Sequence, residues 1–261
     1  MIEKDKRCFK NGVVYALETD DGMPVEVTDT FLPFYTKDAI GRGQNKLDSN
    51  DLGSRNERWM VGVSCMSGCP VGCKFCATGQ LKDWRLISSK EIIEQIEFVL
   101  DKNPQYDPNG SQEFKINYTR MGEPFFNIYA VKKVIQEIDK KYPNTHHYLS
   151  TIGVKGSDIS WIKDNVTLQI SLHSLDEDRR KELIPINNLM SLEELGQIRT
   201  KSNLKTTLNL TLVDEKDFDI KRLKELFDPE YFFVKLSPIN PNVVSDENEL
   251  GLGIVEAVNL V

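Results

Sequence analysis

The chain has 261 residues, 39% of them hydrophobic, and a formal net charge of −7. This length allows one sizeable core, and no apolar run is long enough to cross a bilayer. The opening sequence MIEKDKRCFK lacks the apolar segment of a secretory signal, so we expect a soluble cytoplasmic protein without a membrane partner. Nucleic-acid binding usually needs a basic surface, and the acidic balance therefore argues against an RNA or DNA substrate.

The N-terminal part of the chain predicts an extension ahead of the main fold. Residues 12–28 contain two strand-like runs around the turn sequence DDG, which is typical of a β-hairpin. Residues 37–58 are polar and predict a solvated loop, with a substrate lid as the alternative. We assign residues 1–59 to this extension and residues 60–261 to the main domain.

Apolar strands and amphipathic helices alternate through the main domain. The strand candidates are near-continuous apolar or β-branched runs, as in parallel strands buried on both faces. They cover residues 60–65, 114–119, 146–153, 166–173, 205–213 and 231–239. The alternation predicts an α/β fold, either a partial (β/α)6 TIM-like barrel or an open doubly wound sheet. Both architectures place functional groups at the carboxyl ends of the strands.

Two helices between these strands have clear start signals. Residues 91–100 carry an apolar stripe, and Ser88 with Glu91 predicts a capping box ahead of it. Residues 128–140 repeat the stripe, with Asn127 as the expected N-cap.

Four of the five cysteines fall in the stretch VSCMSGCPVGCKFCATGQ, residues 63–80, directly after the first strand: Cys65, Cys69, Cys73 and Cys76. An odd cysteine count without an export signal argues against a disulfide framework. Metal binding or redox chemistry is therefore the leading explanation for the clustered thiols.

Four interpretations of the cysteine cluster compete. A zinc knuckle usually pairs its thiolates as C-x2-C, and the chain has one such pair. A dithiol redox site would use Cys73 and Cys76 alone, while four buried structural thiols are unusual at this density. An iron–sulfur cluster on three thiolates fits the C-x3-C-x2-C register of Cys69, Cys73 and Cys76, and leaves one iron open for a small molecule.

This register, with Phe75 before its last cysteine, resembles the signature of the radical S-adenosylmethionine (SAM) superfamily. In that family one 4Fe-4S cluster binds SAM at its open iron, and electron transfer into the sulfonium yields methionine and a 5′-deoxyadenosyl radical. The blocks CKFCATGQ, RMGEPFFN, STIG, ISLHSLDEDRRKELIPIN and SPINP follow in order. Together they resemble the subgroup of the adenine-C2 and adenine-C8 methyltransferases of ribosomal RNA. The resemblance implies a partial barrel of the radical SAM type with the β-hairpin as an N-terminal extension, and a flavodoxin- or ferredoxin-type electron donor.

The resemblance also implies where the cofactors bind. Cys69, Cys73 and Cys76 are the expected catalytic metal ligands, and Glu123 would accept a charge-assisted hydrogen bond from the SAM ammonium group. The other expected SAM-binding residues lie at strand ends or beside the cluster: Phe75, Ser150, Thr151, Ser171, His173 and Asn240. Arg120, where the subgroup has glycine, is expected beside this site.

Two departures from the methyltransferases guide the expected reaction. The segment ahead of the cluster motif is short where those enzymes have an RNA-holding helical domain, and no cysteine follows Cys76 to receive a methyl group. With all six barrel strands present, we expect a complete catalytic module that acts on a small deazapurine, with no nucleic-acid partner. Among short members of the subgroup the chain most resembles queuine lyases. We therefore expect a radical SAM lyase that cleaves queuine to 7-aminomethyl-7-deazaguanine (preQ1), with an RNA adenine methyltransferase lacking its accessory domain as the alternative.

Overall fold

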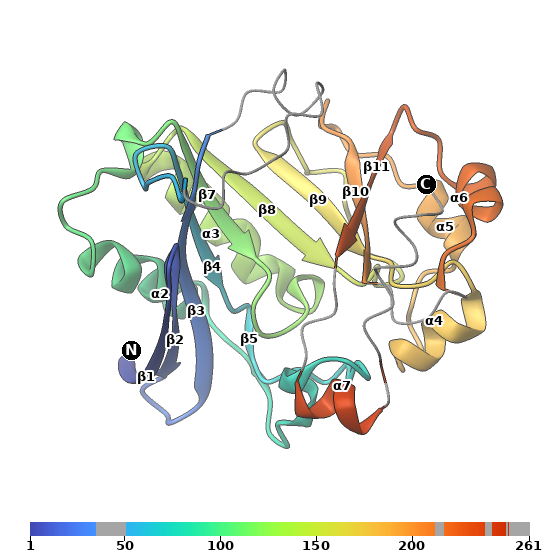
Figure 1. Cartoon of the computed structure of the whole chain (residues 1–261), viewed down its shortest axis with the longest axis horizontal. Coiled ribbons are helices and arrows are strands. Elements are labelled where there is room, and N and C mark those ends of the chain that lie inside the picture. Colours follow the sequence, from blue (N-terminus) through green and yellow to red (C-terminus); the bar gives the residue numbers. More distant parts are fainter. Residues whose placement is uncertain (35–50, 212–216, 238–241, 249, 251–261) are drawn as a thin grey trace. The chain divides into compact units, whose positions relative to one another are not determined.

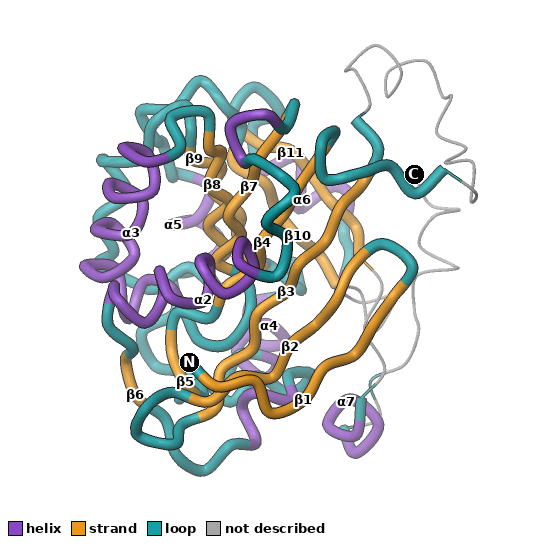
Figure 2. The backbone as a smooth tube through the Cα atoms, turned by 90° about the vertical axis from the view of Figure 1, so that its left-hand side faces the viewer, coloured by secondary structure: helices purple, strands orange, loops and turns teal. Residues whose placement is uncertain are grey.

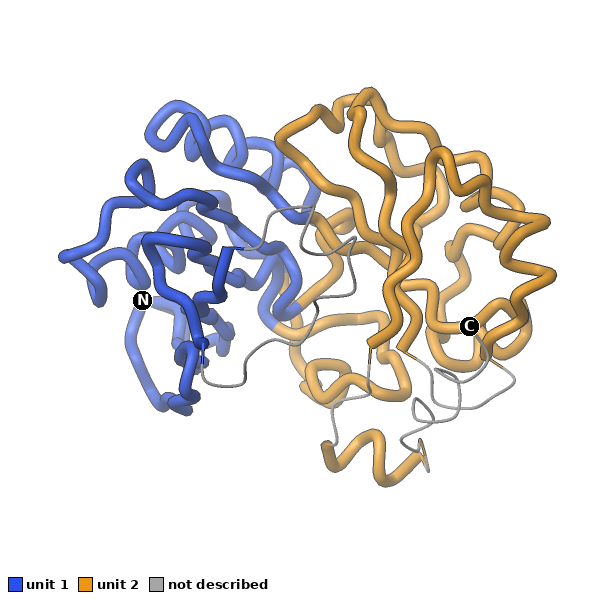
Figure 3. Tube along the Cα trace, turned by 45° about the horizontal axis from the view of Figure 1, so that its top comes forward, with its two compact units in different colours: residues 1–67, 86–121, 127–148 blue, residues 68–85, 122–126, 149–261 orange. Residues whose placement is uncertain are grey.

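The computed structural model describes residues 1–34, 51–211, 217–237, 242–248 and 250. The described residues up to Ser67 form strands, and from Ser89 onward helices and strands mostly alternate (Figure 1), as expected for an α/β fold. The chain forms two compact units (Figure 3): unit 1 comprises residues 1–67, 86–121 and 127–148, and unit 2 comprises residues 68–85, 122–126 and 149–261. None of the helices in the described ranges has the length and hydropathy that a membrane span requires.

The long strands that lie wholly in unit 1 are β1 (Ile2–Phe9), β2 (Gly12–Glu18), β3 (Pro24–Leu32), β4 (Arg58–Val63) and β7 (Glu113–Tyr118). The first four pair antiparallel in chain order, and β4 then pairs in parallel with β7 (Figure 2). The predicted hairpin is confirmed as β2 and β3. Strand β1 was not predicted, because nearly all its side chains are exposed and its sequence, IEKDKRCF, does not alternate between apolar and polar residues.

The two long helices of unit 1 are α2 (Ser89–Asp101) and α3 (Ile128–Lys141), which pack against each other. Both bury most of the predicted apolar stripe. The capping box of α2 is confirmed, because Ser88 Oγ accepts from the Glu91 N–H and the Glu91 carboxylate accepts from the Ser88 N–H.

The predicted cap of α3 is confirmed in position but not in its side-chain hydrogen bond. Asn127 occupies the N-cap position, but its side chain accepts no hydrogen bond from the first turn of the helix. Its Nδ2 instead donates to the carbonyl oxygens of Cys65 and Ile87, both over 2.7 Å. The amide therefore satisfies buried backbone groups of the segments beside it, which an N-cap signal cannot reveal.

A buried carboxylate organises the core of unit 1. Asp29 on β3 is 1% exposed and accepts from Trp59 Nε1 over 2.9 Å and from Asn103 Nδ2 over 2.9 Å. Arg55 donates to both carboxylate oxygens, over 3.1 and 2.6 Å. This network joins β3, β4 and the end of α2 through side chains that are far apart in the sequence.

Unit 2 contains the last residues of β8 (Thr145–Thr151). The strands next to β8 in the sheet are, in order, β9 (Val166–Ser171), β10 (Thr206–Thr211) and β11 (Phe232–Ser237). Strands β9, β10 and β11 pair in parallel. Their sheet order follows the chain order, as in a β/α barrel, whereas a doubly wound sheet reverses its order at a switch point. The six predicted strands are all present as β4, β7, β8, β9, β10 and β11.

Short elements complete the described fold. The helices of unit 2 are α4 (Glu177–Leu183), α5 (Leu192–Gly196), α6 (Ile220–Leu226) and α7 (Val243–Glu247). The short strands are β5 (Met66–Ser67) and β6 (Arg85–Leu86), and the 3-10 turns are η1 (Ala77–Gln80), η2 (Pro108–Gly110) and η3 (Pro124–Asn127). Cys65, expected in a strand, lies at a buried bend after β4.

Candidate functional site

Three thiols lie on one tight loop of unit 2. The backbone at Gly72 is left-handed, with φ +67°, and a Cβ built at Gly79 would lie 2.9 Å from the Gly72 Cα. The loop can therefore fold back on itself at these two glycines, and no side chain fits between them. Cys69, Cys73 and Cys76 on this loop are free and partly exposed.

The chemistry of these thiols fits an iron–sulfur cluster. Burial raises the pKa of Cys69 to about 11 and raises the pKa of Cys73 well above its usual value, and the charge of Cys76 acts in the same direction on both. The thiols therefore lie close enough for their charges to interact. Because their pKa values are raised, they ionise readily only beside a strong positive charge, which a bound metal supplies. A cubane takes one thiolate per iron, so its ligands need not converge on one point. Within the described ranges, no three His, Cys, Asp or Glu side chains are placed to hold a single metal ion, as a zinc knuckle requires.

A buried carboxylate lies beside the thiol loop. Glu123 is 3% exposed and its charge raises the pKa of both Cys69 and Cys73. Its Oε1 accepts from Thr151 Oγ1 over 2.6 Å, and its Oε2 accepts from the Ile152 N–H over 2.9 Å. Burial raises the pKa of Glu123 to about 7, although these donors act in the opposite direction.

The hydrogen-bond partners of Glu123 do not neutralise its negative charge. Among the described residues its hydrogen-bond donors are all neutral: the Thr151 hydroxyl and the backbone N–H groups of Phe125 and Ile152. A buried carboxylate is costly unless a positive group pairs with it. The ammonium group of SAM is a cation of this kind, so the arrangement fits the expected role of Glu123.

His173 follows β9 and combines several unusual features. Among the described residues it is the one non-glycine residue with a left-handed backbone, at φ +61°. Its ring is 5% exposed and lies 4.4 Å from the Phe75 ring, centroid to centroid. Burial lowers its pKa to about 3, with Arg180 acting in the same direction, so the ring is neutral. Its Nδ1 is buried without a hydrogen-bond partner in the described part of the chain, which points to a ligand at this position.

The two expected serines form a second polar group. Ser150 Oγ and Ser171 Oγ lie 3.2 Å apart, and Gln169 Nε2 donates to Ser150 Oγ over 2.8 Å. Adjacent strand residues point to opposite faces, so Ser150 belongs to this group while Thr151 belongs to the group around Glu123.

Sequence reasoning missed three polar residues in this part of unit 2. Gln169 lies beside Ser150, and the Asn209 carbonyl oxygen accepts from the His173 N–H over 3.3 Å. Ser237 Oγ donates to Asn209 Oδ1 over 2.7 Å. For Gln169 and Asn209 the sequence did contain a signal, an amide side chain inside an otherwise apolar strand. A buried amide needs a hydrogen-bond partner, so these two positions could have been predicted as part of a polar group.

The remaining expected residues are Asn240 and Arg120. Asn240 lies outside the described residues; nearby, Asn242 Nδ2 donates to the Phe75 carbonyl oxygen over 3.1 Å. Arg120, which was expected beside the SAM site, forms an ion pair with Glu26 of β3 within unit 1. Its charge is therefore met by a carboxylate of the N-terminal strands.

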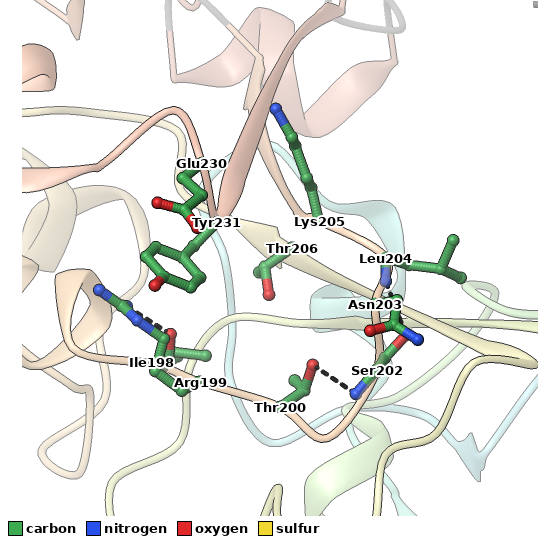
Figure 4. Close-up of a pocket in the computed structure, with 10 residues that line it drawn as sticks. All are labelled: Ile198, Arg199, Thr200, Ser202, Asn203, Leu204, Lys205, Thr206, Glu230 and Tyr231. Carbon is green, nitrogen blue, oxygen red and sulfur yellow. Dashed lines mark hydrogen bonds between the residues drawn. The ribbon is translucent and has the colours of Figure 1, made fainter.

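A surface pocket of about 470 Å³ lies at the amino ends of β10 and β11 (Figure 4). Arg199 stacks over the Tyr231 ring at 4.0 Å, and Lys205 Nζ donates to the Pro229 carbonyl oxygen over 2.6 Å. Of the expected SAM-binding residues that the structure describes, none lines this pocket. Strand amino ends and carboxyl ends lie at opposite edges of a parallel sheet, so the pocket is separate from the candidate site.

Comparison with known families decides between the interpretations of the thiols. The family model described as the Radical SAM superfamily matches residues 63–227, which include the thiol loop, Glu123 and His173. The chain belongs to the radical SAM superfamily. Its cofactors are therefore one 4Fe-4S cluster and SAM, as expected from the cysteine register.

Several curated relatives of this radical SAM chain carry the name "Probable dual-specificity RNA methyltransferase RlmN". The relative from Pseudothermotoga lettingae is 34% identical over 191 residues, covering 68% of this chain and 54% of the relative. The one from Desulfitobacterium hafniense is 34% identical over 204 residues, covering 73% and 57%. The one from Petrotoga mobilis is 30% identical over 256 residues, covering 93% and 65%. The chain spans about half the length of the first of these relatives.

A solved structure shares the fold of the radical SAM chain. It is a radical SAM methyltransferase from Sphaerobacter thermophilus, with a TM-score of 0.64 and 22% sequence identity. The match covers 92% of this chain and 67% of that one. This likeness confirms the α/β radical SAM fold that the sequence predicts.

These relatives contradict the expected queuine cleavage and the expected absence of a nucleic-acid partner, because they are named RNA methyltransferases. Two arguments misled the sequence interpretation. The net charge of −7 is a sum over the whole chain and does not describe the local surface on which RNA binds. The second argument compared the chain with methyltransferases that are about twice as long as the part it matches. A domain or thiol that the chain lacks therefore does not decide which reaction it catalyses.

Proposed function

We propose that this chain carries the catalytic machinery of a radical SAM enzyme that methylates a base in RNA, with adenine as the target. The observation that carries the cofactor part of this proposal is a buried carboxylate with neutral partners, Glu123, close to the thiols of Cys69 and Cys73. The RNA part is supported by the names of the relatives.

The described residues supply distinct functions in this proposal. Cys69, Cys73 and Cys76 hold the cluster, which when bound supplies the electron that splits SAM. Glu123 accepts from the SAM ammonium group, and Thr151 fixes the carboxylate through its 2.6 Å hydrogen bond. In these positions the residues would hold SAM beside the cluster, at the carboxyl ends of the strands.

The remaining expected residues bind the rest of SAM. The Phe75 ring packs against the neutral ring of His173, and the Nδ1 of His173, which has no hydrogen-bond partner among the described residues, would bind a polar group of the cofactor. The hydroxyl groups of Ser150 and Ser171 lie 3.2 Å apart and supply polar contacts. Asn240 is proposed from its motif alone. A flavodoxin- or ferredoxin-type electron donor and a cytoplasmic location stay predictions.

The proposal is tested by anaerobic incubation of the reconstituted protein with SAM, a reductant and unmodified RNA. Mass spectrometry should detect 5′-deoxyadenosine and methionine from one SAM, S-adenosylhomocysteine from a second SAM that donates the methyl group, and a methylated adenine in the digested RNA. The Cys76→Ala variant is the matched control and should give none of these products. Formation of 5′-deoxyadenosine without any change in the RNA would contradict the proposed substrate while leaving the cofactor assignment in place.

A further inference from the structure

Arg180 on α4 is a fully buried cation held by carbonyl groups. Its side chain is 0% exposed, its Nη1 donates to the Met190 carbonyl oxygen over 2.5 Å, and its Nη2 donates to the Ile152 carbonyl oxygen over 2.6 Å. Its Nε is buried without a hydrogen-bond partner in the described part of the chain. Burial lowers its pKa to about 10, although the charge of Glu177 acts in the opposite direction. Among the described residues no carboxylate hydrogen-bonds this guanidinium, and a buried charge without such a partner is unfavourable for folding, so another explanation is needed for its position.

The carbonyl that Arg180 holds belongs to a residue of the candidate SAM site. Ile152 donates its N–H to Glu123 Oε2 over 2.9 Å and accepts from Arg180 at its carbonyl oxygen. The residue is therefore fixed from both sides, by the carboxylate at its amide and by the guanidinium at its carbonyl. Both contacts lie within unit 2.

The turn after Ile152 has little freedom of its own. Gly153 has φ +83°, and a Cβ built there would lie 2.7 Å from Leu195 Cδ2 and 3.5 Å from Arg180 Nη2. The Met190 N–H donates to the Gly153 carbonyl oxygen over 2.9 Å, and the Met190 carbonyl oxygen accepts from Arg180. Arg180 thus joins the end of β8 to the segment before α5. A lysine offers a single ammonium group and cannot reproduce this planar two-carbonyl contact.

We propose that Arg180 is a positioning residue for the SAM site: its guanidinium holds the Ile152 turn so that Glu123 is oriented to receive the SAM ammonium group. This inference rests on the proposed role of Glu123. Arg180 acts through the turn and does not itself contact the cofactor.

The chain offers a matched control on the same helix. Arg179 is the neighbouring residue, with 24% of its side chain exposed, and it pairs with Glu182 over 2.8 Å and with Asp217 over 3.5 Å. Arg179→Met therefore removes the same chemical group from the same helix without touching Ile152. The test variants are Arg180→Met, which removes the charge, and Arg180→Lys, which keeps it.

The first measurement is amide hydrogen exchange in the protein without cluster or SAM. Exchange at the Ile152 amide should become about tenfold faster or more in both Arg180 variants, since the hydrogen bond to Glu123 is loosened. Arg179→Met should leave this amide unchanged. Faster exchange throughout unit 2, with no excess at Ile152, would show a purely structural role and overturn the inference. Arg180→Lys keeps this measurement decisive if Arg180→Met does not fold.

The second measurement is a double-mutant cycle on SAM affinity in the cluster-loaded protein, read by equilibrium dialysis. Glu123→Gln and Arg180→Lys should each raise the Kd by about tenfold or more, and the double variant should exceed Glu123→Gln by no more than about twofold. If the fold-increase in Kd of the double variant equals the product of the two single fold-increases, the two residues act independently, which would overturn the role of Arg180. An unchanged Kd in Glu123→Gln would instead refute the proposed function of Glu123, so the two failures are distinguishable.

Discussion

The Thr151 hydroxyl donates to Glu123 Oε1 over 2.6 Å, and so connects two motifs that lie 28 residues apart in the sequence. Glu123 belongs to the MGEP motif after β7, and Thr151 is the last residue of β8. The hydroxyl holds the carboxylate without neutralising it, because a neutral donor cannot replace a counter-ion. This contact gives the candidate site a buried acceptor that is fixed in place before any cofactor binds.

Glu123 should give the cluster-free protein a measurable pH dependence. Burial raises its pKa from 4.5 to about 7, so the native state binds this proton more tightly than the unfolded state does. The resulting stabilisation is fully present below about pH 4.5 and is lost as the pH rises towards about 7. Urea unfolding across this range should show a steeper loss of stability in the wild type than in Glu123→Gln, which cannot ionise. Parallel curves for the two proteins would contradict the assigned burial of Glu123.

Two glycines in unit 2 allow a test of the turn that carries Ile152. Gly153 and Gly156 have similar left-handed backbones, with φ of +83° and +80°, but only Gly153 has a neighbour in the way, since Leu195 Cδ2 lies 2.7 Å from a built Cβ. Both Gly→Ala changes should cost about 1–2 kcal/mol from the backbone conformation. Gly153→Ala should cost about 1–3 kcal/mol more from overpacking, measured as the free energy of unfolding. Equal losses in the two variants would argue against the close packing at Gly153.

The Asp29 network should dominate the stability of unit 1. Asp29→Ala removes the acceptor of Trp59, Arg55 and Asn103 and leaves the partly buried guanidinium of Arg55 without its carboxylate. We expect a loss of about 3–5 kcal/mol in the free energy of unfolding by urea. Asp20→Ala, in the exposed turn between β2 and β3, is the control and should stay within about 0.5 kcal/mol of the wild type. A loss below about 1 kcal/mol for Asp29→Ala would contradict the role of this network.

The cysteines should divide into two groups by metal content. Alanine at Cys69, Cys73 or Cys76 should abolish cluster binding after anaerobic reconstitution, since each removes one of three thiolate ligands. Alanine at Cys8, which is exposed on β1, or at the buried Cys65 should leave iron and sulfide at the wild-type level. Iron and sulfide analysis of the five variants reads out both expectations. Iron retained by any variant of the first group would mean that the register is wrong.

Local signals made much of the fold predictable. The capping box of Ser88 and Glu91 was readable because both partners lie within one helical turn. The partners of Asn127 lie 62 and 40 residues away, so its true contacts depend on the tertiary fold. The same limit explains β1, whose exposed residues form a strand by pairing with β2 and carry no apolar signal of their own.

Residues of the candidate site could be inferred from the sequence where a motif restricts the residue type. Residues whose role depends on burial in the tertiary fold could not. The cysteine register and the proposed role of Glu123 were inferred from the sequence, because metal ligation and strand-end position restrict the choice of residue. Arg179 and Arg180 are identical in type and adjacent, and no sequence signal indicates that the first is partly exposed while the second is fully buried. The left-handed backbone of His173 is similarly imposed by its surroundings.

The central claim is that Cys69, Cys73 and Cys76 hold a 4Fe-4S cluster with one iron open to SAM beside Glu123. Electron paramagnetic resonance of the anaerobically reconstituted, reduced protein tests this most directly when spectra are recorded before and after addition of SAM. The account predicts the signal of a reduced 4Fe-4S cluster whose shape changes when SAM binds, with a weaker response at equal SAM concentration in Glu123→Gln. A cluster signal that SAM leaves unchanged in the wild type, or no cluster signal at all, would contradict it.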